Sequence, residues 1–237
     1  MQAEAAAIVP AAGAGTRFGG SVKKSFVRLR GVPLLVHTLT ALQGSGSIRW
    51  IVVVVRVGQE AAVRAWAKRY RLTKVLAPCV GGASRAESVA RGLAAVPPAA
   101  KWIVVHDGAR PCVRSALIDA AVRAARRHGA VACGVPAMLT VKAVDAQRAV
   151  RETLDREQLW FVQTPQAFRR AWFAKACERV NAHAAQFPDD AAVLEAAGFP
   201  VRMIPGDSLN VKVTTKDDVV LAEAILRSRH AANGRRA

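Results

Sequence analysis

Short runs of β-branched residues alternate along most of the chain with alanine-rich segments whose apolar residues recur at helical spacing. The run WIVVVV at 50–55 is continuously apolar, which is typical of a strand covered on both faces. At 33–43, by contrast, Leu35, Leu39 and Leu42 share one face of a predicted helix. The same patterns predict further strands at 6–10, 74–77, 102–105, 130–136 and 201–204. They predict further helices at 59–70, 84–96, 115–128, 169–182, 190–197 and 216–229.

Strands that alternate with helices in this way predict an α/β fold, in which helices cover both faces of a mostly parallel sheet. Residues 137–162 interrupt the alternation, because 140–144 and 149–154 resemble two strands around a polar turn at 145–148. We expect a projecting β-hairpin arm there, and such arms often form dimer contacts. Since neither an internal repeat nor a linker is evident, we expect 1–237 to form one domain.

The composition excludes several classes of protein. With 52% hydrophobic residues among 237, the chain can bury a sizeable core and is not expected to be disordered. No apolar run is long enough to cross a bilayer, and the N-terminus lacks the basic stretch of a signal peptide. The cysteines are far apart without a C-x-x-C pair, so we expect reduced thiols in a cytoplasmic protein; they are Cys79, Cys112, Cys133 and Cys177.

The net charge is the unusual feature of the composition. Lys and Arg number 35 against 17 Asp and Glu, which gives a formal charge of +18. Such a chain could bind nucleic acid or an anionic small substrate. The cations are dispersed along predicted helices, and no basic and aromatic residues cluster to stack bases, so we favour a solvated surface over nucleic-acid binding. A nucleic-acid-binding module stays as an alternative, which a salt-dependent mobility shift would reveal.

The ligand site of an open α/β sheet lies outside the carboxyl ends of its strands, and PAAGAGTRFGG at 10–20 follows the first predicted strand. Gly13 and Gly15 allow close backbone approach, and successive amides can bind an anion. Arg17, Lys23 and Lys24 add positive charge, so the segment suits a polyphosphate rather than being a turn without a ligand. It departs from the Walker A loop and from the dinucleotide fingerprint, so we expect neither of those sites.

Asp107 follows the apolar strand predicted at 102–105 and precedes a glycine. One carboxylate together with phosphate oxygens is a typical Mg²⁺ arrangement, because Mg²⁺ takes few protein ligands. The alternative is a turn that Asp107 caps, and we interpret His106 as structural. Lys212 lies among apolar residues ahead of the last predicted helix. It is a candidate for directing an ammonium into the same site, although such a lysine is more often a surface residue.

These segments, taken in order with several others, resemble the 2-C-methyl-D-erythritol 4-phosphate cytidylyltransferases of the non-mevalonate isoprenoid pathway. The resemblance extends from Val9 to about Ala222. The matching motifs are PAAGAGTR at 10–17 with Lys24, GGASRAESV at 81–89, VHDGARP at 105–111, TLDR at 153–156, QTPQ at 163–166, DDA at 189–191 and NVKVT at 210–214. Lys23 stands where the family usually has proline, so only the register favours Lys24 over Lys23 as the acting lysine.

The resemblance implies a Rossmann-like, glycosyltransferase-A-type sheet in a single nucleotidyltransferase domain, and a homodimer whose arms at about 137–162 interlock. It implies that CTP and 2-C-methyl-D-erythritol 4-phosphate react, with Mg²⁺, to give the CDP-linked product and pyrophosphate. A cytidylyltransferase for another polyol phosphate, such as ribitol 5-phosphate, stays as an alternative. A sugar nucleotidyltransferase for a different base is disfavoured by the cytosine segment at 81–88.

The same resemblance assigns roles to individual residues. Asp107 would hold the Mg²⁺, and the catalytic residues would be Lys24, Lys212 and Arg17. The nucleotide-binding positions would be Ala11, Ala12, Gly13, Ala14, Gly15, Gly82, Ser88 and Gly108. The positions that contact methylerythritol phosphate would be Arg110, Thr140, Arg156 and Thr164, of which Thr140 and Arg156 would reach over from the partner's arm.

Overall fold

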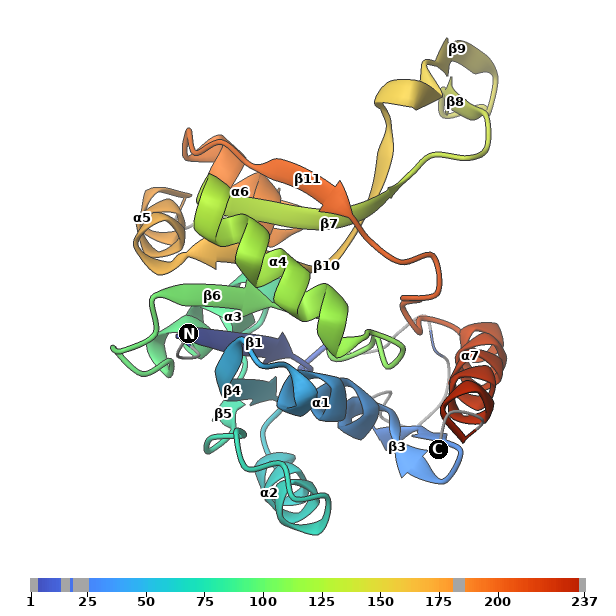
Figure 1. The fold of residues 1–237 in the computed structure, drawn as a ribbon. Helices are drawn as coiled ribbons and strands as arrows, with labels where there is room; N and C mark the ends of the chain where they lie inside the picture. Colours follow the sequence, from blue (N-terminus) through green and yellow to red (C-terminus); the bar gives the residue numbers. More distant parts are fainter. Residues whose placement is uncertain (1–3, 14–17, 19–25, 181–185, 235–237) are drawn as a thin grey trace.

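A seven-stranded sheet forms the centre of the protein in the computed structural model, which describes residues 4–13, 18, 26–180 and 186–234 (Figure 1). In their order across the sheet, its strands are β11 (Arg202–Pro205), β7 (Ala130–Pro136), β10 (Trp160–Arg169), β6 (Trp102–Val105), β1 (Ala5–Pro10), β4 (Ile48–Val55) and β5 (Cys79–Val80). β10 runs antiparallel to β6 and β7, and the other neighbouring strands are parallel. The mostly parallel sheet predicted from the sequence is confirmed.

Helices cover both faces of this sheet, because its strands are apolar on both sides. In β4, Val53 and Val55 pack on one face, whereas Val52 and Val54 pack on the other. The first face is covered by α1 (Leu34–Gly44), α2 (Glu60–Arg69) and α4 (Ser115–His128). The opposite face is covered by α3 (Arg85–Ala94), α5 (Arg170–Val180) and α6 (Asp190–Ala196). Because helices cover both faces of the sheet, the candidate site lies at the ends of the strands rather than on a face.

β10 was not predicted from the sequence. Its middle carries the polar run Gln163, Thr164, Pro165, Gln166, which interrupts the apolar pattern and the pairing with β7. The polar side chains are nevertheless buried, because each forms a hydrogen bond with a neighbouring segment. As a result, the helix predicted to start at Arg169 starts one residue later, after the end of β10.

The strand predicted at 74–77 is wrong. Only Val75 forms a bridge there, to Ile51 of β4, and regular pairing with β4 resumes at Cys79. Pro78 lies between these two points of pairing. Since proline has no backbone N–H to donate to a ladder, it separates the bridge from β5.

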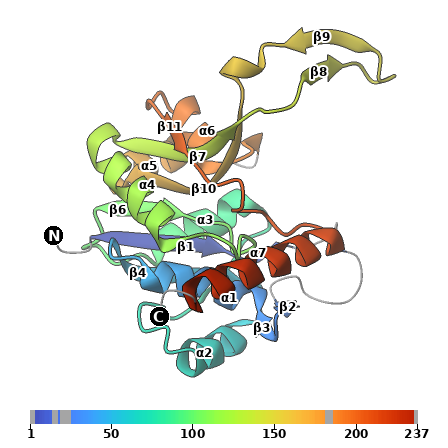
Figure 2. The ribbon, with the colours of Figure 1, turned by 45° about the vertical axis from the view of Figure 1, so that its right-hand side comes forward.

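The predicted hairpin arm is present as β8 (Val141–Val144) and β9 (Val150–Leu154), followed by a short 3₁₀ helix at Arg156–Gln158. Figure 2 shows the arm extending away from the sheet. The predicted limit at residue 162 overlaps the sheet, because β10 already pairs with β7 at Trp160. The arm is therefore continuous with β10 through its second strand.

A third group of buried residues packs α7 (Lys216–Gly234) against a small hairpin of β2 (Arg28–Leu29) and β3 (Val32–Pro33). The turn between these strands places Arg30 and Gly31 at positive φ, as a two-residue hairpin requires. α7 continues to Gly234 rather than ending at residue 229 as predicted. Among the described residues, no helix combines the length and the apolar character that a membrane span needs.

Candidate functional site

A cavity of about 770 Å³ lies at the carboxyl ends of β1, β4, β5 and β6. Its walls come mainly from the segments that follow β1, β4 and β6, from the turn between β5 and α3, and from the segment ahead of α7. This is the position at which an open α/β sheet binds ligands. Of the residues predicted to bind nucleotide, the cavity wall contains Ala11, Ala12, Gly13, Gly82, Ser88 and Gly108.

Paired glycines allow the turn before α3 to approach both α3 and the segment after β1. A Cβ atom at Gly81 would lie 2.6 Å from the Cβ atom of Ala12 and 2.7 Å from Oγ of Ser88. The amide of Gly82 donates to Oγ of Ser88 over 3.1 Å, and Ser88 itself is buried. The Ser88 hydroxyl therefore fixes the turn, and it brings together Gly82 and Ser88, which were both predicted to bind nucleotide.

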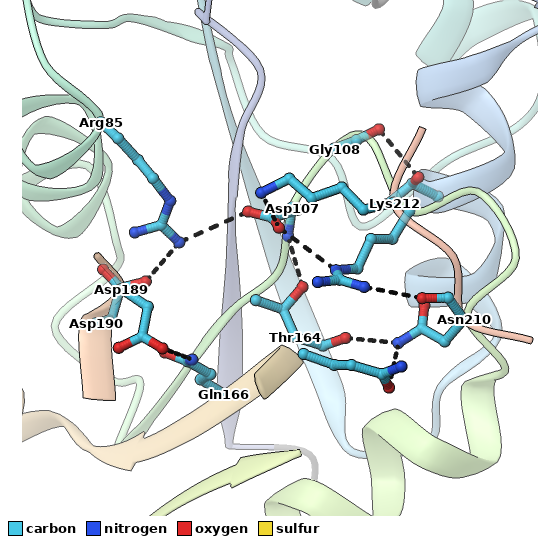
Figure 3. A network of polar contacts seen from close by, with 12 residues as sticks. Arg85, Asp107, Gly108, Thr164, Gln166, Asp189, Asp190, Asn210 and Lys212 are labelled. Carbon is cyan, nitrogen blue, oxygen red and sulfur yellow. Dashed lines mark hydrogen bonds and ion pairs between the residues drawn. The ribbon is translucent and has the colours of Figure 1, made fainter. Parts of the chain in front are cut away.

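Asp107 extends from the end of β6 into this cavity, and three cations surround its carboxylate (Figure 3). Lys212 Nζ lies 2.8 Å from Oδ2, Arg110 Nε lies 3.4 Å from Oδ2, and Arg85 Nη2 lies 3.6 Å from Oδ1. Burial raises the pKa of Asp107, but the charges of these cations outweigh burial and hold its pKa well below the usual range. Asp107 is therefore ionised at neutral pH.

Backbone and amide contacts fix the groups around Asp107. The Asp107 amide donates to Oγ1 of Thr164 over 3.0 Å, which ties β6 to β10. Asn210 Nδ2 donates to the Thr164 carbonyl over 2.8 Å, and Arg110 Nη1 donates to the Asn210 carbonyl over 2.8 Å. Because Lys212 follows Asn210 by two residues, these bonds hold its backbone beside the site.

A second cavity of about 310 Å³ adjoins the first, and the two share Arg85, Asp107 and Lys212 in their walls. The smaller cavity is also lined by Arg110 and Thr164, which were predicted to bind the second substrate. Two ligands that filled both cavities would meet at the carboxylate of Asp107 and its cations. Such a site can bring two anions together, because the cations offset their mutual repulsion.

The donor set fits Mg²⁺ rather than zinc. Asp107 offers a hard, ionised carboxylate to a cavity that could also receive phosphate oxygens. Within the described part of the chain, no three His, Cys, Asp or Glu side chains are grouped as metal ligands. His106 beside Asp107 is buried, and burial lowers its pKa to about 4, so it is neutral, in keeping with a structural role.

Thr140 and Arg156 are not part of either cavity in this chain. Both lie in the projecting arm, where Arg156 Nη1 donates to the carbonyl of Met138 over 3.0 Å. Four further residues predicted to belong to the site lie outside the described residues, as does Lys23, and they are Ala14, Gly15, Arg17 and Lys24.

The sequence did not assign roles to several residues that build the site. Arg56 lines the larger cavity, and its Nε donates to the carbonyl of Ala12 over 2.8 Å. Arg85 lines both cavities and binds Asp190 of α6 over 2.7 Å. Arg85 and the Asp189-Asp190 pair belong to recognised motifs, but no local pattern indicates that residues 105 positions apart would meet.

Comparisons with known proteins show which family the chain resembles over nearly its whole length. The family model for 2-C-methyl-D-erythritol 4-phosphate cytidylyltransferase matches residues 5–228. A protein of that name from Desulforamulus reducens is 41% identical over 225 residues, which cover 94% of this chain and 96% of the relative. Another of that name, from Syntrophus aciditrophicus, is 40% identical and covers 96% of this chain and 97% of its own length.

Solved structures of similar proteins share the fold. The crystal structure of 2-C-methyl-D-erythritol 4-phosphate cytidylyltransferase from Thermus thermophilus aligns with a TM-score of 0.75 at 32% identity, covering 94% of this chain and 98% of that one. The 4-diphosphocytidyl-2C-methyl-D-erythritol synthase from Anaerococcus prevotii aligns with a TM-score of 0.83 at 27% identity, covering 94% and 96%. The resemblance seen in the sequence motifs therefore extends over nearly the whole chain.

Proposed function

Because the chain belongs to the 2-C-methyl-D-erythritol 4-phosphate cytidylyltransferase family, we propose that its adjoining cavities bring CTP and 2-C-methyl-D-erythritol 4-phosphate together. The enzyme transfers the cytidylyl group, forming 4-diphosphocytidyl-2-C-methyl-D-erythritol and pyrophosphate in isoprenoid precursor biosynthesis. The main support for this site is that both cavities share three charged residues in their walls, and these are Asp107, Arg85 and Lys212.

The reaction is an in-line displacement at phosphorus. An oxygen of the polyol phosphate attacks the α-phosphorus of CTP, the bond to the β-phosphate oxygen breaks, and pyrophosphate leaves. The attacking phosphate is already an anion, so no protein base is needed. The protein must instead offset the repulsion between two anions and stabilise the charge that develops on the transferred phosphoryl group. A junction rich in cations meets this requirement.

The larger cavity suits the nucleotide. Its glycine-rich walls present backbone groups close to a flat ligand, and the residues that would contact the base and ribose are Ala11, Ala12, Gly82, Ser88 and Gly108. Gly13 begins the loop that would receive the triphosphate. We assign the β- and γ-phosphates to Ala14, Gly15, Arg17 and Lys24, on the strength of the sequence motif.

The smaller cavity suits the polyol phosphate. Arg110 and Thr164 line its wall, and Lys212 lies at its border with the larger cavity. Lys212 would contact the oxygens of the transferred phosphoryl group. Asp107 would hold Mg²⁺, which when bound would neutralise phosphate charge.

The arm suits a homodimer contact. It exposes apolar side chains, notably Met138, Leu139, Val144 and Val150, that a partner subunit could cover. In such a dimer of one-domain protomers, acting in the cytoplasm, Thr140 and Arg156 would complete the polyol phosphate site of the partner. We therefore expect Arg156→Ala to raise the KM for the polyol phosphate more than the KM for CTP in steady-state kinetics. The reverse pattern would place Arg156 at the nucleotide.

The decisive test is pyrophosphate release by the purified protein with CTP and Mg²⁺. Release with 2-C-methyl-D-erythritol 4-phosphate, and much slower release with ribitol 5-phosphate, is the expected result. Release with ribitol 5-phosphate alone would keep the nucleotide site but overturn the proposed substrate. Release with neither would remove the proposed function, and a salt-dependent mobility shift would then test nucleic-acid binding.

A further inference from the structure

The wall that separates the two cavities carries an arginine with an unusual pair of partners. Arg85 is the first residue of α3, and its side chain is about one-third exposed. Its Nη2 atom lies 2.7 Å from Oδ2 of Asp190 but 3.6 Å from Oδ1 of Asp107 (Figure 3). The guanidinium is therefore bound by Asp190, and it only approaches Asp107.

Asp190 is held in place by the segment around it. It is the first residue of α6, and its side chain is almost wholly buried. Gln166 of β10 fixes this end of the helix, since its Nε2 donates to Oδ2 of Asp189 and its Oε1 accepts from the amide of Ala191, each over 3.0 Å. The carboxylate of Asp190 thus has little freedom to follow Arg85 if the arginine moves.

A buried ion pair of this kind is weak evidence for a stabilising role, because desolvation of both charges offsets much of their attraction. Without Asp190, the guanidinium would be free to turn fully toward Asp107, the other carboxylate within reach. With Asp190 in place, it stays near Asp189 and Gln166, which line the smaller cavity and not the larger one. The pair therefore determines where the positive charge lies.

We propose that Arg85 binds the attacking phosphate monoester at the junction of the cavities, and that Asp190 is the positioning residue that presents its guanidinium. This inference rests on the proposed function. The contact with Asp190 uses Nη2, whereas a guanidinium has five N–H donors in a planar fork, so the fork can still bind phosphate oxygens. Arg85 lines both cavities, but Asp189 and Gln166, which lie beside Asp190, line the smaller cavity and not the larger one. On this ground we assign the arginine to the second substrate rather than to CTP.

The test is the kinetics of Arg85→Ala, Asp190→Asn and the double variant, with each substrate varied in turn. Loss of a charged hydrogen bond predicts a fall of about 10- to 100-fold in kcat/KM for the polyol phosphate in either single variant, with the KM for CTP changed less than about threefold. Because Asp190 acts through Arg85, the double variant should match Arg85→Ala alone. Additive losses, or a matching rise in the KM for CTP, would overturn the proposal.

Two further variants separate this role from a purely structural one. Arg85→Lys keeps the charge beside Asp190 but loses the planar fork, so it should fold normally and still show the weakened use of the polyol phosphate. Arg179→Ala is the matched control, because Arg179 Nη1 donates to the Ala197 carbonyl at the opposite end of α6, away from both cavities. It should lower the Tm without altering either KM. Normal polyol phosphate kinetics in Arg85→Lys and Asp190→Asn would refute the inference.

The wild-type assay distinguishes a failure of the proposed function from a failure of the role assigned to Arg85. If the wild-type protein releases no pyrophosphate with CTP and 2-C-methyl-D-erythritol 4-phosphate, the proposed function fails and the role of Arg85 fails with it. If the wild type is active and the variants at Arg85 and Asp190 behave like it, only the positioning role fails.

Discussion

Replacing Lys212 with alanine should separate catalysis from stability. Lys212 Nζ lies 2.8 Å from Asp107, which corresponds to about 6 kcal/mol of attraction at an effective dielectric constant of about 20. The Lys212 side chain is 39% exposed, so solvent screening reduces its net contribution to folding to about 1 kcal/mol. Arg85 and Arg110 remain beside Asp107 in the variant, so the buried carboxylate keeps its partners.

Catalysis should suffer far more than folding. Removing one group that stabilises charge in a transition state typically slows the reaction by about 100- to 1,000-fold, or about 3–4 kcal/mol. A loss of about 1 kcal/mol in stability corresponds to a fall in Tm of only about 2–4 °C for a chain of this size. We therefore expect Lys212→Ala to remain folded at 25 °C while losing nearly all of its turnover.

The measurement combines steady-state pyrophosphate release with thermal unfolding of the same preparation. Lys216→Ala is the matched control, since Lys216 is an exposed lysine four positions further along, outside both cavities. It should retain the wild-type rate. A rate for Lys212→Ala within about threefold of wild type, or an equal loss in both variants, would refute the role assigned to Lys212.

The remaining predictions concern the metal, the glycine wall and acid stability. Asp107→Asn should raise the Mg²⁺ concentration needed for half-maximal rate, and an unchanged metal titration would exclude Asp107 as the ligand. Gly81→Ala should cost about 1–3 kcal/mol in urea unfolding and raise the KM for CTP, because the added Cβ would lie 2.6 Å from Ala12; unchanged values would contradict this wall geometry. Burial raises the pKa of Asp218, but hydrogen bonds from Thr214 and the residue after it outweigh burial and lower it to about 2. This folded pKa lies below the ordinary value of 3.8, so the stabilisation is present above about pH 4 and is lost as the pH falls toward 2. Asp218→Asn should reduce that acid-dependent loss in unfolding experiments, and an unchanged pH profile would contradict the assignment.

The parts of the site that the sequence predicted have local signals. Asp107 comes shortly after an apolar strand and precedes a glycine, so its place at the strand end, where the cavity lies, could be predicted from neighbouring residues. Gly82 and Ser88 form a motif within one turn and the start of one helix, and the structure joins them by a hydrogen bond. In both cases the signal that places the residue lies within a few neighbouring positions.

The parts that the sequence did not predict depend on contacts between distant segments. The pairing of Arg85 with Asp190 joins residues 105 positions apart, and neither residue lies in an apolar pattern that would indicate burial. β10 was missed for a related reason. Thr164 and Gln166 have the polarity of a loop, and they are buried only because β6 and α6 supply hydrogen-bond partners for them.

The insertion of β10 between β6 and β7 also constrains the order in which the chain can fold. β1, β4, β5 and β6 all lie within the first 105 residues, so these strands can pair as soon as that part of the chain has been synthesised. β7 reaches the rest of the sheet only through β10, and Lys212 follows later still. A nascent chain therefore completes its sheet late, and the junction between the two cavities is among the last parts of the protein to become competent.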